Sequence, residues 1–235
     1  MIKFFATLAL EFFDYFHKIK IINFLKKMGI SKIKFFFDIG AHKGESIDFF
    51  SKNLTIDKIY SFEASPENFL FLKNKFKNKK DLVLENIGLS SKISKMIFNQ
   101  CNESSSSTFS VINHNSKYLK KKMRLLNSSK ENNFFKKIEM TTNTLDNYLN
   151  DNNILNIDLI KIDTEGHEYD VVMGLGQNIR NVKTIIFEHH YDNMIRKNYT
   201  FSDIDLLLKR NFFRQVFKIK MPFRKSFEYI YTNEK

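Results

Sequence analysis

The chain has 235 residues, of which 43% are hydrophobic and 26 are Phe, a size and composition that suit one α/β domain with a substantial core. A single cysteine, Cys101, excludes a disulfide framework and a thiolate zinc site. The net charge of +12 is carried mainly by scattered lysines, and its densest blocks, 73–80 and 117–122, are expected to be solvated faces. Binding of nucleic acid or anionic lipid is the less favoured interpretation, and no aromatic-interleaved RNA-binding motif is present.

The first thirty residues form an apolar extension. Residues 4–28 place large apolar side chains at three- and four-residue steps, which predicts an amphipathic helix with a potential break at Lys18–Lys20. We expect this extension, 1–30, to pack against the main domain, 31–235, or against a second copy of the chain, with contact to a membrane surface as the alternative. Glu11 and Asp14 interrupt its apolar start, which is too short to span a bilayer and lacks a cleavage site, so a cytoplasmic protein is expected.

Two apolar runs near the start of the main domain each end at an acid. Residues 33–37 lead to Asp38, and residues 56–62 lead to Glu63, so both predict buried strands of an open α/β sheet. Between them, a turn bracketed by Gly40 and Gly44 opens a helix over 45–53, and the N–H groups at its start suit a polar or anionic ligand. The G-x-x-x-G spacing differs from the dinucleotide fingerprint, which disfavours a nicotinamide-dependent oxidoreductase. An acid at the second strand's end can accept hydrogen bonds from ribose hydroxyls.

The middle of the chain alternates between predicted elements and polar stretches. Strands are expected at 82–87, 93–99 and 138–142, and Ser65 and Thr144 are expected to cap helices. The polar segment 100–116, with serines at 104–107, is expected to be a loop that is disordered in the free protein and closes over a substrate. Residues 117–137 are rich in Lys and Asn and are interpreted as an insertion. A helix at 202–208 and an antiparallel hairpin of strands 212–219 and 227–232 are expected to complete the domain.

Titratable residues cluster after two later strands. The strand 157–162 is followed within six residues by Asp163, Glu165, His167 and Glu168, and a helix is expected at 169–175. The next strand, 182–187, leads to Glu188, His189 and His190. A single helical crossover joins these strands, so their carboxyl ends should be neighbours. Like charges crowded at a strand end repel one another, which indicates a site that handles a cation, a metal or a proton.

These motifs resemble the FkbM-type S-adenosylmethionine-dependent methyltransferases. The matching segments are 37–44, 60–64, 86–90, 144–146, 160–168 and 186–188, and the K-I-D-T-E-G-H-E stretch at 161–168 is the most specific of them. The resemblance implies a class I methyltransferase (Rossmann-like) α/β fold with a seven-stranded, mostly parallel sheet, an antiparallel last strand and helices on both faces. It implies O-methylation of a hydroxyl on a sugar, glycan precursor or natural product. An RNA methyltransferase and a non-catalytic binding protein of the same fold remain alternatives.

The resemblance also implies the site. The amino-acid end of S-adenosylmethionine is expected at Asp38, Gly40, Ala41, His42 and Gly44, and its ribose at Glu63; Ala64, Gly88 and Leu89 complete the expected cofactor-binding set. A sugar hydroxyl needs a base or a metal to lower its pKa. We expect His167 or His189 to be the base, with Asp163 and Glu165 orienting the base or the substrate. In the competing version Asp163 and Glu188 hold a divalent cation such as Mg²⁺. His190 is interpreted as a packed or exposed imidazole, and Glu168 as a helix cap.

Overall fold

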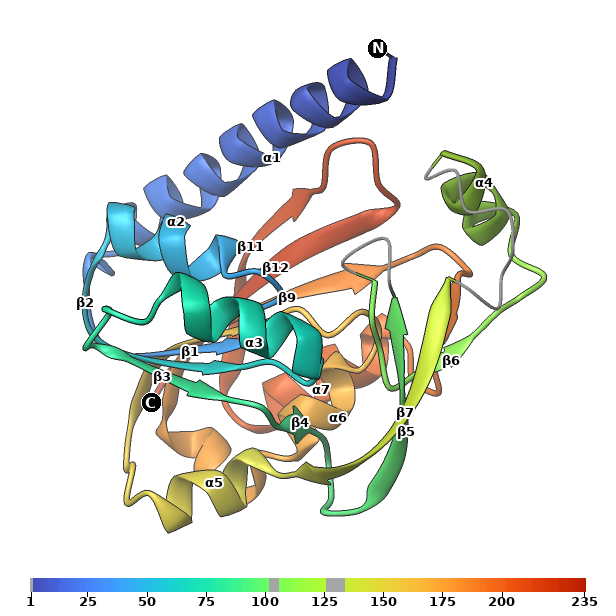
Figure 1. Ribbon diagram of the computed structural model, residues 1–235. Helices are drawn as coiled ribbons and strands as arrows, with labels where there is room; N and C mark the ends of the chain where they lie inside the picture. Colours follow the sequence, from blue (N-terminus) through green and yellow to red (C-terminus); the bar gives the residue numbers. More distant parts are fainter. Residues whose placement is uncertain (1, 102–105, 126–133) are drawn as a thin grey trace.

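The computed structural model describes residues 2–101, 106–125 and 134–235 (Figure 1). A seven-stranded sheet in the order β11-β12-β9-β8-β1-β2-β3 forms its centre. The strands are β1 (Lys32–Ile39), β2 (Thr55–Phe62), β3 (Leu82–Glu85), β8 (Ile157–Ile162), β9 (Val182–His190), β11 (Phe213–Lys220) and β12 (Ser226–Asn233). From β9 to β3 neighbouring strands are parallel, whereas β12 is antiparallel to both β9 and β11. The expected mostly parallel sheet with an antiparallel last strand and a closing hairpin is therefore confirmed.

Helices cover both faces of the sheet, also as expected (Figure 1). One face carries α1 (Ile2–Lys27), α2 (Glu45–Asn53) and α3 (Pro66–Lys75), and the other carries α5 (Leu145–Asp151), α6 (Glu168–Met173) and α7 (Phe201–Arg210), with a 3₁₀ turn over Gly176–Asn181. Successive side chains of a strand point to opposite faces, so the adjacent residues Phe36 and Phe37 belong to the two separate apolar clusters under these helices. Phenylalanine thus fills the core on both sides of the same strand.

The predicted helix starts are confirmed by their hydrogen bonds. The Ser65 hydroxyl accepts from the Asn68 N–H at 3.2 Å, and the Thr144 hydroxyl accepts from the Asn147 N–H at 3.1 Å. These caps satisfy N–H groups that have no partner inside the helix. They fix where α3 and α5 begin after their preceding strands.

The N-terminal helix α1 runs without interruption from Ile2 to Lys27, so the potential break at Lys18–Lys20 is absent. Lysine is a good helix former, and the buried side chains of Ile21, Ile22 and Leu25 hold the helix against the sheet beyond that point. Two ion pairs join α1 to β12 and the turn before it: His17 to Glu228 at 2.5 Å and Asp14 to Arg224 at 2.7 Å. In the described part of the chain, no helix combines the length and the apolar character needed to cross a membrane.

Smaller strands form a second layer at one side of the sheet (Figure 1). β5 (Lys95–Cys101) pairs antiparallel with β7 (Phe135–Asn143), and β4 (Gly88–Leu89) pairs parallel with β7. β6 (Val111–Ile112) pairs with β10 (Ile195–Arg196), and α4 (Lys117–Leu125) lies between β6 and β7 in the chain.

The structure corrects the bounds of two expected strands. The segment interpreted as an insertion, 117–137, contains α4 and the first residues of β7, while 126–133 fall outside the described residues. β7 starts before residue 138 because Phe135 pairs with Cys101 and Phe134 is buried beside it. The strand expected at 82–87 ends at Glu85, where the Asn86 amide turns to donate to the Glu63 carbonyl at 2.7 Å.

Candidate active site

A pocket opens beside the carboxyl ends of β1 and β2. Its walls come from these two strand ends, from β4, from the residues after β8, and from Phe98 with the segment that follows β5. The space between these walls, counted together with the solvent at its open side, is about 510 Å³. Its lining residues are Ile39, Gly40, His42, Phe62, Glu63, Ala64, Asn68, Ile87, Gly88, Leu89, Phe98, Ser107, Thr108, Phe109, Asp163 and Thr164.

The turn after β1 forms the floor of this pocket through backbone contacts. The N–H groups of Gly40 and Ala41 both donate to the Phe62 carbonyl, at 2.9 and 3.1 Å. Gly40 has a φ of 84°, and a Cβ built on it would lie 1.9 Å from the Asp163 carbonyl oxygen. Only glycine permits this conformation and this close approach, so β1, β2 and β8 meet at the pocket because residue 40 has no side chain.

Glu63 carries the pocket's buried carboxylate. One oxygen accepts from the His42 N–H at 2.7 Å and the other from the Ser65 N–H at 2.8 Å, so the carboxylate is fixed in position. Burial nevertheless raises the pKa of Glu63 to about 7, against the effect of these hydrogen bonds. A carboxylate held beside apolar walls such as Phe62 and Leu89 suits a nucleoside, whose ribose hydroxyls can donate to it while the base packs on the walls.

The expected cofactor-binding residues divide into two groups. Gly40, His42, Glu63, Ala64, Gly88 and Leu89 line the pocket, whereas Asp38, Ala41 and Gly44 do not. Asp38 is fully buried behind the turn, and neither of its carboxylate oxygens has a hydrogen-bond partner within the described residues. Burial raises the pKa of Asp38 to about 6, although the charge of Lys161 lowers it.

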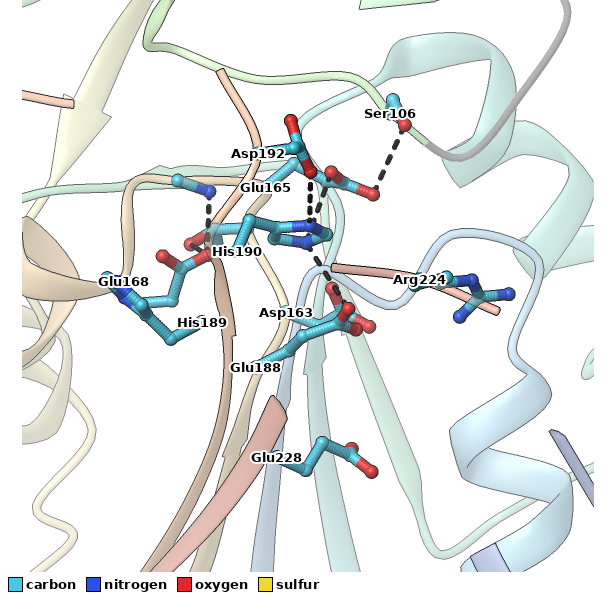
Figure 2. Close-up of polar contacts among 12 residues, drawn as sticks. Ser106, Asp163, Glu165, Glu168, Glu188, His189, His190, Asp192, Arg224 and Glu228 are labelled. Atoms are coloured by element: carbon cyan, nitrogen blue, oxygen red, sulfur yellow. Dashed lines mark hydrogen bonds and ion pairs between the residues drawn. The ribbon is translucent and has the colours of Figure 1, made fainter. Parts of the chain in front are cut away.

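A group of charged side chains, which includes Asp163, lies at the ends of β8 and β9 (Figure 2). We call Asp163, Glu165, Glu188, His190 and Asp192 the acid–histidine cluster. The His190 Nε2 lies 3.4 Å from a carboxylate oxygen of Glu165 and 3.4 Å from one of Glu188, and its Nδ1 lies 3.6 Å from Asp192. Asp163 belongs to both regions, since it lines the pocket and its carboxylate lies beside that of Glu188 (Figure 2).

The charges of this cluster depend on one another. Burial disfavours the charged form of the His190 imidazole and by itself would lower the pKa. The negative charges of Glu165 and Glu188 have the larger effect and raise the pKa of His190 to about 10. Burial raises the pKa of Glu188 to about 7, while the charge of His190 opposes that rise. The pKa of Asp163 is instead lowered, because the Lys161 ammonium, 3.0 Å away, outweighs the effect of burial. At neutral pH the cluster therefore combines a charged imidazole with a carboxyl group, Glu188, that is poised to exchange a proton.

Neither histidine that we expected to be the base joins this cluster. The His167 ring is buried against Phe109 and its Nε2 lies 3.0 Å from the Ser90 hydroxyl. The His189 ring points away from His190 and packs among aromatic side chains, including Tyr199; burial lowers its pKa to about 3 (Figure 2). The histidine in contact with the carboxylates is His190, which we had interpreted as a packed or exposed ring.

Glu168 shapes the loop that follows β8. One of its oxygens accepts from the Gly166 N–H at 2.8 Å and from the Thr164 hydroxyl at 3.3 Å, and the other accepts from the Tyr199 hydroxyl. Glu168 is fully buried. It therefore ties the loop to the start of α6, and the loop in turn holds Glu165 at a φ of 52°, in the left-handed region.

The residues present do not fit a divalent cation. In the part of the chain that the structure describes, no group of three or more His, Cys, Asp or Glu side chains is arranged to hold a metal ion. Asp163 and Glu188, the expected ligands, already face the positive charges of Lys161 and His190. We derive no step through a metal.

The order of the strands, with β12 reversed against its neighbours, and a pocket at the carboxyl ends of β1 and β2 are the architecture of the class I methyltransferase fold. Residues 38–215 match the model of the methyltransferase FkbM domain. That match covers well over half of the sequence, and the chain belongs to the FkbM methyltransferase family.

Two solved structures share the fold. A methyltransferase FkbM from Methylobacillus flagellatus KT is 13% identical with a TM-score of 0.50, over 86% of this chain and 44% of that one. Magnesium protoporphyrin IX methyltransferase from Synechocystis PCC 6803, solved with bound SAM, is 9% identical with a TM-score of 0.53, over 94% of this chain and 80% of that one. The chain thus spans less than half the length of the Methylobacillus protein. No curated protein matches it in sequence.

Proposed function

We propose that this protein transfers the methyl group of S-adenosylmethionine to a hydroxyl of a sugar or sugar-containing acceptor. The observation that carries the proposal is the position of Asp163, which lines the pocket at the ends of β1 and β2 and also belongs to the acid–histidine cluster. A donor bound in the pocket would therefore lie beside groups that can orient a hydroxyl and take its proton. The resemblance of the sequence to FkbM-type methyltransferases supports the sugar hydroxyl as acceptor.

The pocket residues account for cofactor binding in this proposal. Glu63 would accept hydrogen bonds from the ribose hydroxyls, and the turn from Gly40 to His42 would pass close to the amino-acid end. When bound, S-adenosylmethionine supplies an electrophilic methyl group on a positively charged sulfur. The neighbouring carboxylates Asp163 and Glu63 suit that positive charge.

Glu188 is the group that we propose as the general base. A base works best when its pKa lies near the working pH, and burial brings the pKa of Glu188 to about 7. His190 would stay protonated, hold the Glu188 carboxylate by their ion pair and keep it from repelling Glu165. As the acceptor oxygen bonds to the methyl carbon, the carbon–sulfur bond breaks, its electron pair stays on sulfur, and the hydroxyl proton passes to Glu188. Asp163, whose pKa is lowered, would stay charged and orient the acceptor by accepting a hydrogen bond from a neighbouring hydroxyl of the sugar.

Transfer of a labelled methyl group to a panel of sugar acceptors tests this proposal. The Glu188→Gln variant should lose about 10²–10⁴-fold in kcat, with unchanged affinity for S-adenosylhomocysteine. The wild-type rate should rise with pH through about 7, as Glu188 loses its proton, and then level off; the variant should lack this rise. Glu139→Gln, at an exposed carboxylate on β7, is the control and should retain full activity. Full activity of Glu188→Gln would contradict the assignment of the base.

A further inference from the structure

A second hollow lies on the far side of His190 from Asp163. Three segments form it: the start of α4 with Asn115 shortly before it, the turn after β9, and the turn between β11 and β12. Its lining residues are Asn115, Lys117, Tyr118, Tyr191, Asp192, Asn193 and Lys225. None of them belongs to the pocket at the ends of β1 and β2.

The hollow is connected to the acid–histidine cluster through Asp192. Its carboxylate lines the hollow and lies 3.6 Å from the His190 Nδ1, while the Nε2 of the same ring faces Glu188. Tyr118 also faces these groups: burial raises the pKa of its phenol, and the charge of Asp192 adds to that rise. Figure 2 shows Asp192 and Asp163 on opposite sides of the His190 ring, so a molecule in this hollow would border the cluster from the side of Asp192.

The lining of the hollow combines aromatic, amide and cationic groups. The Tyr191 side chain is 49% exposed, and its hydroxyl is fixed 2.7 Å from that of Tyr229, so its ring offers a firm surface for a sugar face. The Asn193 side-chain carbonyl accepts from the Ser116 hydroxyl at 2.8 Å, which holds that amide in place. Both features are typical of sites that bind sugars by stacking and by hydrogen bonds from oriented polar groups.

The two lysines of the hollow indicate what kind of sugar it would bind. Lys117 and Lys225 are exposed and come from different elements, and neither ammonium forms an ion pair within the described residues. The one acid of the lining, Asp192, is already engaged by His190 and by the Met194 N–H, which donates to it at 2.8 Å. The hollow therefore presents two uncompensated positive charges, which favour an anionic group.

From this combination we propose that the hollow is the acceptor subsite and that the acceptor is a sugar carrying a phosphate or carboxylate group, bound by Lys117 and Lys225. The proposal rests on the proposed function, because it takes the acceptor to react at the acid–histidine cluster. The anionic group would hold one end of the sugar at the lysines and direct a hydroxyl at its other end past Asp192 towards Glu188.

NMR titration of the full chain tests this proposal with three probes: inorganic phosphate, glucuronate and glucose. Backbone amide signals of Tyr118, Tyr191 and Asn193 should shift saturably with phosphate or with glucuronate and not with glucose. The anion that binds more tightly shows whether the site favours a phosphate or a carboxylate group. In Lys117→Gln/Lys225→Gln the affinity for that anion should fall about tenfold or more, whereas Lys52→Gln, at an exposed lysine in the last turn of α2, should leave it unchanged.

The proposal is overturned if neither anion causes saturable shifts, if glucose binds as tightly as the anions, or if the double variant binds like the wild type. Addition of S-adenosylhomocysteine to the same samples separates this outcome from failure of the proposed function. Shifts at Gly40 and Glu63 without an anion site would overturn the inference alone. An anion site without those shifts would leave an anion-binding hollow and overturn its role as an acceptor subsite.

Discussion

Gly40 shows how one residue brings three strands together at the pocket beside the ends of β1 and β2. Its backbone takes a φ of 84°, and the Asp163 carbonyl occupies the space where a side chain would begin. The same carbonyl belongs to the residue whose carboxylate reaches the acid–histidine cluster. The distance between the pocket and the acid–histidine cluster thus depends on a contact that only glycine allows.

Replacement of Gly40 by Ala should lower the free energy of unfolding by about 2–3 kcal/mol or more, because it adds both a strained φ and a clash with the backbone. Gly29→Ala is a matched control: its φ is 81°, yet nothing lies within 4 Å of the added Cβ. It should cost only about 1–2 kcal/mol, the cost of the left-handed conformation alone. Urea denaturation of both variants measures the difference. Equal losses would show that the close approach to Asp163 has no energetic importance.

The position of His190 in the acid–histidine cluster could have been predicted from the alternation of side chains along a strand. In β9, Glu188 and His190 are two residues apart and share a face, whereas His189 points to the other face. We expected His167 or His189 to be the base without applying this alternation; His189 packs among aromatic side chains, and burial lowers its pKa to about 3. By contrast, Asp38, Glu63 and Asp163 could be found directly, since each ends an apolar run that had to be a buried strand.

At the scale of elements, the loop between β8 and α6 holds the carboxylates in position. Glu168 accepts hydrogen bonds from Thr164, Gly166 and Tyr199, which come from the loop and from the residue before α7's cap. The Ser110 hydroxyl also donates to the Gly166 carbonyl at 2.7 Å. The most specific sequence motif of the chain is therefore partly structural, with Glu168 supporting the loop and Glu165 reaching the cluster.

Tyr199→Phe should destabilise the protein by about 1.5–3 kcal/mol, because it leaves the buried Glu168 carboxylate with one donor fewer. Tyr15→Phe, at a tyrosine of α1 that is 54% exposed, should change the stability by less than about 0.5 kcal/mol. Chemical denaturation of the two variants beside the wild type provides the measurement. A Tyr199→Phe variant as stable as the control would mean that the hydroxyl does not support the loop.

The elements that cover the sites were the least predictable. The pocket at the ends of β1 and β2 is lined in part by Ser107, Thr108 and Phe109, which lie in the stretch that we interpreted as a loop. The second hollow is bordered by α4, which lies in the stretch that we interpreted as an insertion. The polar stretch 100–116 has no apolar periodicity, and part of its structure comes from contacts with distant residues, such as the hydrogen bond from the Ser110 hydroxyl to the Gly166 carbonyl. In α4, by contrast, Leu119 and Met123 have helical spacing, a signal that we overlooked among the lysines. The expectation that the serine loop covers a substrate is consistent with Ser107 at the pocket; Ser104 and Ser105 lie outside the described residues.

At the scale of the whole molecule, the order of the strands makes one site out of distant segments. β1 lies between β2 and β8, so its carboxyl end joins the pocket acid of β2 to the cluster acids of β8 and β9. Apolar runs were sufficient to predict the buried strands, because parallel strands buried on both faces appear as continuous apolar stretches. The seven-stranded sheet with an antiparallel last strand was predicted from the resemblance to the FkbM-type methyltransferases. The positions of the side chains in the acid–histidine cluster depend instead on the register of the strands and on the segments that cover this edge of the sheet.

The central claim is that the pocket at the ends of β1 and β2 binds S-adenosylmethionine through Glu63. Calorimetric titration with S-adenosylmethionine and S-adenosylhomocysteine tests it most directly. The wild type should bind both, and Glu63→Ala should bind each about 10–100-fold more weakly, since it loses hydrogen bonds to a charged acceptor. Glu67→Ala, at an exposed carboxylate four residues further on, should bind as the wild type does. Absence of binding to either nucleoside by the folded wild type, or equal affinities in Glu63→Ala and the wild type, would contradict the account.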